Sequence, residues 1–349
     1  MSTVASASET PVQAQNDQRK RGCLFYIKRG LLVVVVLIVG LPLFGFTYEV
    51  IMAPGDAERY PPIGQMVDVG GHRLHLYCVG EGSPTVVLEA GHGFVALAWT
   101  MVQPEIANTV RTCAYDRAGL GWSELGPNPR TPERIAQELH TLLDNAGIGP
   151  PYVLAGHSIG GKHIRMFTEL YPDDVVGLVF VDARHESADP VRTQEEFEAD
   201  SAAYVSSLEL YRVLRRFGVA RLLAVPLGRS VSPSFNHLPD DVVYRLVLLG
   251  VTENTLQSFI GQSDMASDDQ LRAAHSLDGL PIVVLTADAS LETPSWEAAQ
   301  HELAALSSNS QWIVVENSTH DIHLDQPQQV ADAVLNVIEA SRRGEPLAQ

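Results

Sequence analysis

The sequence is poor in positive charge and in cysteine. Lys and Arg number 24 against 42 Asp and Glu, which gives a net charge of −18 over 349 residues. So acidic a chain argues against nucleic acid, and against a flat anionic membrane surface, as its partner. Only three cysteines occur, and no pair of His or Cys residues has the spacing of a zinc site. We therefore expect no metal and no cofactor.

Long hydrophobic runs are also scarce, and one stands out. Residues 31–48 form an uncharged run of about 18 residues, close to the minimum for crossing a bilayer. Five basic residues precede it (Arg19, Lys20, Arg21, Lys28 and Arg29). The positive-inside rule then predicts a single-pass protein with a cytoplasmic N-terminus and an extracytoplasmic body. A cleaved signal peptide and a buried core helix are the alternatives, but no good A-x-A site follows the run.

The two cysteines of the body bear on this topology. Cys78 and Cys113 lie in two expected strands, whereas Cys23 precedes the apolar run on its cytoplasmic side. An exported body would permit a disulfide between Cys78 and Cys113. Two buried free thiols are the alternative.

The hydrophobic pattern divides the chain into five parts. We expect a basic cytoplasmic tail (1–30), a transmembrane anchor (31–50), a linker (51–62), an α/β core (63–184 and 280–345) and a helical cap (185–279). Expected strands are 66–69, 74–79, 85–90, 110–115, 152–155, 176–181, 281–286 and 311–316. Because helical stretches such as 131–146 separate them, we expect a mostly parallel sheet covered on both faces. Helices at 193–207, 208–223, 239–249 and 253–266 would form the cap. One of them, with arginines among apolar residues at 211–227, is either an amphipathic surface that touches lipid or an ordinary cap helix with a solvated basic face.

The motif Gly156-His157-Ser158-Ile159-Gly160 follows the apolar strand 152–155 and precedes an expected helix over 162–170. Serine can stand exposed on so tight a turn only if the flanking positions carry almost no side chain. The helix that follows points its free N–H groups toward whatever the serine attacks. Ser158 is therefore the expected nucleophile.

A serine nucleophile needs a base and an acid that orients the base. His320 follows the last strand and Asp288 ends the preceding one, so the order is serine, acid, histidine, each at the carboxyl end of a strand. His323 is a rival for the base, and Asp182, which ends the strand over 176–181, is the alternative acid. Asp321 is adjacent to the histidine, where its geometry is poor.

Acyl transfer also requires N–H donors where negative charge develops. The N–H of Ile159, directly after the nucleophile, is one such donor. The loop Gly91-His92-Gly93-Phe94 follows a buried strand, and we expect the second donor to be the N–H of Phe94.

Four stretches of the sequence resemble the α/β-hydrolase superfamily, and the resemblance extends over about residues 63–345. They are the turn motif Gly156 to Gly160, called the nucleophile elbow, and His92-Gly93, the run Tyr115 to Ser123 and Thr319-His320. The resemblance implies an eight-stranded sheet with a cap inserted after the sixth strand. It also implies that Asp116 and Arg117 are scaffolding. Dehalogenases and epoxide hydrolases of this fold carry aspartate at the elbow, so Ser158 argues against both. Hydrolysis of a small-molecule carboxylic ester is the expected reaction. Amide or peptide hydrolysis and a non-catalytic binding module are the alternatives, and the sequence does not indicate an oligomeric state.

Overall fold

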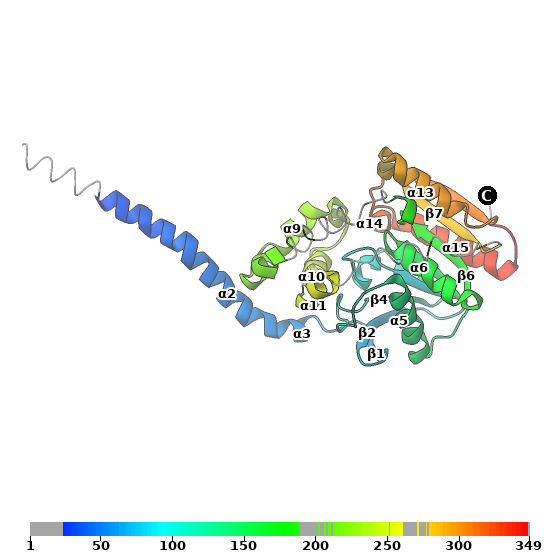
Figure 1. Cartoon of the computed structure of the whole chain (residues 1–349), viewed down its shortest axis with the longest axis horizontal. Coiled ribbons are helices and arrows are strands. Elements are labelled where there is room, and N and C mark those ends of the chain that lie inside the picture. The colour runs from blue at the N-terminus through cyan, green and yellow to red at the C-terminus, as the bar shows by residue number, and fades with distance from the viewer. Residues whose placement is uncertain are drawn as a thin grey trace, which may run out of the picture.

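A long helix projects from a compact α/β body in the computed structural model of the chain (Figure 1). The structure describes residues 24–188, 209–210, 212–250, 252–260 and 279–347, together with residues 202, 206, 271 and 277. The sheet, its covering helices and most of the segment between β6 and β7 fall within these ranges.

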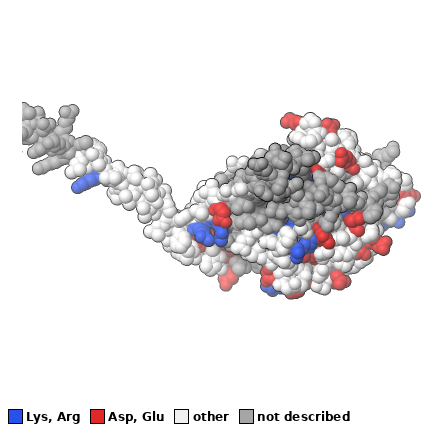
Figure 2. Space-filling view, viewed as in Figure 1, with Lys and Arg blue, Asp and Glu red and all other residues white. Residues whose placement is uncertain are grey.

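The projecting helix runs from Leu24 to Gly55 and is long and apolar enough to cross a membrane. It contains a π-helical turn, η1 (Val36–Gly40), and the segment α2 (Leu41–Met52). Its surface in Figure 2 is almost free of charged residues after the first turns. The helix continues through η2 (Ala53–Gly55) into α3 (Asp56–Arg59). The residues expected to form a linker (51–62) are therefore helical up to Arg59, because extending a helix that has begun costs less than starting one.

The body is built on an eight-stranded sheet of order β1-β2-β4-β3-β5-β6-β7-β8. The pairs β1–β2 and β2–β4 are antiparallel, and every other neighbouring pair is parallel. The fold class expected from the sequence is confirmed. The strands are β1 (Gln65–Asp68), β2 (Arg73–Val79), β3 (Thr85–Glu89), β4 (Thr112–Tyr115), β5 (Tyr152–His157), β6 (Val175–Val181), β7 (Ile282–Ala287) and β8 (Ser310–Val315).

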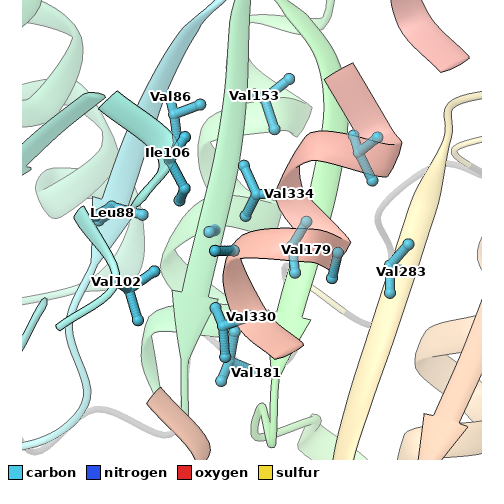
Figure 3. Close-up of a cluster of buried hydrophobic side chains, with 14 of the residues drawn as sticks. Val86, Leu88, Val102, Ile106, Val153, Val179, Val181, Val283, Val330 and Val334 are labelled. Atoms are coloured by element: carbon cyan, nitrogen blue, oxygen red, sulfur yellow. The ribbon is translucent and has the colours of Figure 1, made fainter. Parts of the chain in front are cut away.

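Helices cover both faces of the sheet, as a mostly parallel sheet requires. On one face α15 (Pro327–Arg343) and α4 (Gln103–Ala107) pack on the central strands. Figure 3 shows Val330 and Val334 of α15 lying against Val153, Val179 and Val181. The opposite face carries α5 (Pro132–Asn145), α6 (Gly160–Leu170) and α13 (Pro294–Ala304).

The segment between β6 and β7 forms a helical cap. It includes α8 (Val219–Leu222), α9 (Ala224–Val231), η6 (Pro233–His237), α10 (Asp240–Gly250) and α11 (Glu253–Ile260). The helix expected over 208–223 ends at residue 216, because Gly218 adopts a left-handed conformation with φ of 68°. Most of the helix expected over 193–207, and residues 261–266, lie outside the described residues. The cap packs on the body through a cluster that joins Phe235 and Val243 to Phe94 and Leu120.

A disulfide joins the two antiparallel strands β2 and β4. Cys78 and Cys113 face each other in the register of this pair, and their sulfurs are bonded. The pairing that the sequence left open is thus present in the structure.

Candidate active site

Ser158 sits on a strained turn between β5 and α6. Its φ of 54° lies in the left-handed region, which costs a non-glycine residue energy and marks a functional turn. A side chain on Gly156 would place its Cβ 2.7 Å from the carbonyl carbon of Gly160. A Cβ on Gly160 would lie 2.7 Å from the carbonyl oxygen of Glu89. Both glycines of the motif are therefore required by space.

The backbone of the turn is held by its neighbours. The N–H of Ser158 donates to the carbonyl of Val181, and its own carbonyl accepts from the N–H groups of Gly161 and Arg184. The serine opens into a cavity of about 290 Å³. The side chains that line this cavity are Ser158, Arg184, Ser290, Thr293, Trp296 and His320. The structure thus brings Ser158 and His320, two of the expected site residues, to one cavity.

His320 is paired with Asp182. Its Nδ1 lies 2.6 Å from Oδ2 of Asp182, whose side chain is fully buried at the end of β6. Asp182 also has a positive φ, of 41°, which turns its carboxylate toward the loop that carries His320. Of the two candidate acids, the one in contact with the histidine is Asp182.

Three further donors orient the Asp182 carboxylate. Ser290 Oγ donates to Oδ2 at 2.6 Å, while Trp296 Nε1 and the backbone N–H of Ala287 donate to Oδ1 at 3.0 and 3.2 Å. Because both oxygens are engaged, the carboxylate cannot rotate freely, and Oδ2 stays directed at the imidazole. Neither Ser290 nor Trp296 belongs to a recognisable sequence motif, so the sequence did not identify them as site residues.

Asp288 does not contact the imidazole of His320, so the expectation that it is the acid that orients this histidine is corrected. Its exposed carboxylate accepts hydrogen bonds from the N–H groups of Asn317 and Ser318, at 2.8 and 3.0 Å, and of Ala289. These bonds, chiefly those from Ser318 and Asn317, lower the pKa of Asp288 below its usual value. Asp288 begins the turn η7 (Asp288–Glu292), which directs it to the backbone of the His320 loop and not to the imidazole.

The two expected oxyanion donors differ in their surroundings. Ile159 is the N-cap residue of α6, so its N–H lies at the positive end of that helix. The N–H of Phe94 donates to the carbonyl of Gly91 at 3.2 Å within the loop after β3. The assignment of Phe94 therefore stays a prediction, and it requires this long turn hydrogen bond to open.

Two neutral histidines lie behind His320. His157 Nε2 is 2.9 Å from the carbonyl oxygen of His320, and the centre of the His323 ring lies 4.3 Å from that of the His157 ring, with the two planes tilted by 46°. Burial, reinforced by the neighbouring histidines, lowers the pKa of His157 well below its usual value. Burial likewise lowers the pKa of His323 to about 3. Both rings are buried and His323 contacts Trp99, whereas the ring of His320 reaches the cavity.

A buried ionic network supports the loop that carries Phe94. Glu89 accepts from Tyr115, Arg117 and His163 in the interior. Burial alone would raise the pKa of Glu89, but Arg117 and His163 outweigh it and lower that pKa. Arg117 also donates to the carbonyls of residues 90 and 91, at 2.5 and 2.7 Å. This contact gives Arg117 the scaffolding position that the family resemblance implied.

Within the ranges that the structure describes, no three His, Cys, Asp or Glu side chains are grouped so as to hold a metal ion.

Comparison with known proteins identifies the family to which the chain belongs. The profile of the Alpha/beta hydrolase family matches residues 86–333. YqjL of Bacillus subtilis is 25% identical over 275 residues, which cover 77% of this chain and 90% of that protein. A probable transporter, efuK, of Hormonema carpetanum is 40% identical over 133 residues, 36% of this chain, but these span only 19% of its own length.

Solved structures agree on the fold. A thermophilic esterase from Thermogutta terrifontis superimposes with a TM-score of 0.59 at 22% identity, over 79% of this chain and 98% of that one. At this identity the likeness concerns the fold alone, and the family profile covers more than half of the sequence. The chain belongs to the alpha/beta hydrolase family.

Proposed function

We propose that the protein is a membrane-anchored serine hydrolase that cleaves carboxylic esters with Ser158, His320 and Asp182. The observation that carries the proposal is the 2.6 Å contact between Asp182 and His320 at a cavity that Ser158 also lines. Nucleophile, base and acid come from the ends of β5, β8 and β6, where parallel sheets of this kind collect ligand sites.

The reaction steps follow from which nitrogen of the His320 imidazole can accept a proton. Nδ1 of His320 is engaged by Asp182, so Nε2 takes the proton of the Ser158 hydroxyl as the oxygen attacks the ester carbonyl. The alcohol then leaves with that proton, and an acyl group remains on Ser158. Water, deprotonated by His320, attacks the acyl group, and the acid departs. Asp182 stays ionised and stabilises the imidazolium in both steps.

The oxyanion of each tetrahedral intermediate would face the N–H of Ile159 and, once its turn bond opens, that of Phe94. A donor of this kind contributes about 10²–10³ in kcat in enzymes of this class. Arg117 would act by holding the loop of the second donor in place through two backbone carbonyls.

Labelling with a fluorophosphonate tests the proposal. The probe should modify the full chain at Ser158, and Ser158→Ala or His320→Ala should abolish both labelling and turnover of p-nitrophenyl esters. Thr293→Val is the matched control, because it removes another hydroxyl that lines the same cavity and should leave the label on Ser158. An unlabelled, inert wild type would favour the non-catalytic binding module. Turnover of aminoacyl amides at higher efficiency than esters would favour the amide hydrolase.

The membrane part of the proposal rests on the helix from Leu24 to Gly55 and on the basic residues that precede its apolar run. The N-terminus would be cytoplasmic and the catalytic body extracytoplasmic, where the Cys78–Cys113 disulfide is stable. Added protease on intact cells should then degrade the body and spare an N-terminal tag. Protection of the body with loss of the tag would overturn this orientation.

A further inference from the structure

The cap exposes an ordered set of apolar side chains beside the long helix. Their spacing at the start is i, i+3, i+4 and i+7, which places them on one side of the helical residues 210 and 212–216 and the turn that follows. The exposed residues are Leu210 (60% exposed), Val213 (47%), Leu214 (37%), Phe217 (37%), Leu222 (48%) and Leu223 (45%). Apolar residues scattered singly over a surface are ordinary, but a contiguous set indicates a partner.

This set touches the membrane-spanning helix through a close backbone contact. A Cβ on Gly45 would lie 2.1 Å from the carbonyl oxygen of Phe217, and a Cβ on Gly218 would lie 2.9 Å from the carbonyl oxygen of Gly45. Two glycines therefore let helix and cap meet without side chains between them. Figure 1 shows the part of the cap next to α9 beside α2 of the long helix.

A buried arginine holds the same junction. Arg221 of α8 donates to the carboxylate of Glu49 at 2.9 Å and, through both terminal nitrogens, to that of Asp56. The side chain of Arg221 is only 2% exposed. Bidentate arginine–carboxylate pairs fix orientation as well as distance. The position of the cap along the helix is thus set by contacts on two successive stretches of it.

These contacts fix the depth of the cap. Gly45 belongs to the uncharged run 31–48, and it lies about 6 Å along the helix axis before Glu49, the first charge after that run. If residues 31–48 cross the hydrocarbon, Phe217 lies level with the last turn inside it. Arg221, paired with Glu49, then lies level with the head groups.

The charge of the same segment differs from that of the body. Arg212, Arg215 and Arg216 follow one another within five residues, and Glu209 is the acidic residue among the described positions 209–223. The rest of the chain is strongly acidic. At physiological salt, charges beyond about 8 Å are screened, so the local basic cluster outweighs the acidic body where the segment meets a surface.

We propose that residues 209–223 form a membrane-contacting surface that inserts its apolar side chains into the leaflet next to the anchor and places its arginines at anionic phospholipid head groups. The inference rests on the anchor of the proposed function. The sequence left open whether this segment contacts lipid, and the proposal makes the membrane its partner. Helix and cap together then hold the catalytic body against the bilayer at two points.

Spin-label accessibility in proteoliposomes tests this surface. The full chain in a Cys23→Ser background carries Leu214→Cys, and the label is examined in phosphatidylcholine vesicles with about one third phosphatidylglycerol. The label at position 214 should collide severalfold more with oxygen, relative to a water-soluble nickel chelate, than a label at Glu339→Cys. Glu339 is the matched control, because its exposed side chain lies on α15, away from the long helix. Val213→Cys replaces Leu214→Cys if the latter does not fold.

The outcomes are distinct. If the label at 214 is as accessible to the nickel chelate as the label at 339, the proposed membrane-contacting surface is refuted. If the label at 214 is accessible to neither reagent, protein and not lipid covers this surface, which refutes the proposal as well. A label at Val36→Cys, in the middle of the long helix, reports the anchor separately. If the label at position 36 is also accessible to the nickel chelate, the proposed membrane span is refuted as well. Ester turnover is measured separately and tests the catalytic part of the proposed function. Arg215→Gln with Arg216→Gln should lower the oxygen ratio at 214 with phosphatidylglycerol, and an unchanged ratio would overturn the head-group contact.

Discussion

Asp182 and His320 are 138 residues apart in the sequence, yet Oδ2 of the first lies 2.6 Å from Nδ1 of the second. The contact separates the roles of the two aspartates near the site. Asp182→Asn should leave the packing intact but present an N–H or a weak acceptor to the imidazole, and kcat should fall about 10⁴-fold, as when the acid of a serine protease triad is amidated. Steady-state turnover of a p-nitrophenyl ester measures it.

Asp288→Asn is the matched change at the neighbouring strand end. It removes charge from a carboxylate that caps backbone N–H groups, so we expect some loss of stability and a much smaller loss of kcat than for Asp182→Asn. A greater kcat loss for Asp288→Asn than for Asp182→Asn would refute the assignment of the acid.

The two aspartates also show which features of the structure the sequence could predict and which it could not. The hydrophobic pattern predicted all eight strands. For the parallel ones the reason is that buried parallel strands need continuous hydrophobic stretches. The elbow glycines likewise predicted the turn at Ser158. Asp182 and Asp288 end adjacent strands, β6 and β7, at one edge of the sheet. Which of them reaches His320 depends on side-chain directions a few ångströms apart, and no sequence pattern encodes these.

Contacts between distant segments escaped prediction for a related reason. Composition identified the apolar run, but it gave no sign that Gly45 would meet Phe217 or that Arg221 would lie between Glu49 and Asp56. Glycine is a weak helix former, but the sequence pattern predicted a helix straight through Gly218. Only the packed cap shows that the helix breaks there and turns toward the anchor.

Gly45→Leu should loosen the junction of cap and anchor. The new side chain meets backbone atoms that cannot rotate away, so the segments must separate, at a cost of about 1–3 kcal/mol. Trypsin cleavage at the arginines of residues 212–216 should become severalfold faster in detergent-solubilised protein. Gly40→Leu is the control, because the nearest atom to its Cβ is 3.7 Å away, on Val36 of the same helix. Equal cleavage rates for the two variants would argue against the contact.

The buried histidines predict an acid-sensitive stability. Since the pKa of His323 is about 3 in the folded chain and near 6.5 when unfolded, the unfolded state binds the extra proton between these values. Stability from this group is present above pH 6.5 and is lost as pH falls toward 3, by up to about 1.4 kcal/mol per pH unit. His323→Leu should flatten the fall of the free energy of unfolding below pH 6.5, measured by urea titration of tryptophan fluorescence.

The control for this slope is His301→Leu, which removes an exposed imidazole. Carboxylates of lowered pKa, such as Glu89 and Asp288, also cost stability on acidification, so the comparison is between slopes and not between absolute values. A His323→Leu slope equal to that of the wild type would show that this histidine is not neutral in the folded protein.

The disulfide predicts a thiol count and a stability difference. Cys78 and Cys113 are bonded across β2 and β4 and close a loop of 35 residues, so the oxidised, denatured chain should titrate one free thiol, Cys23, and three after reduction. Cys78→Ala with Cys113→Ala should lower the free energy of unfolding by about 3–4 kcal/mol, because the unfolded chain regains the freedom that the cross-link removes. Cys23→Ser, outside the loop, should leave it unchanged. Three free thiols before reduction, in protein isolated from its membrane without reductant, would show that the body matures in a reducing compartment and would reverse the proposed orientation.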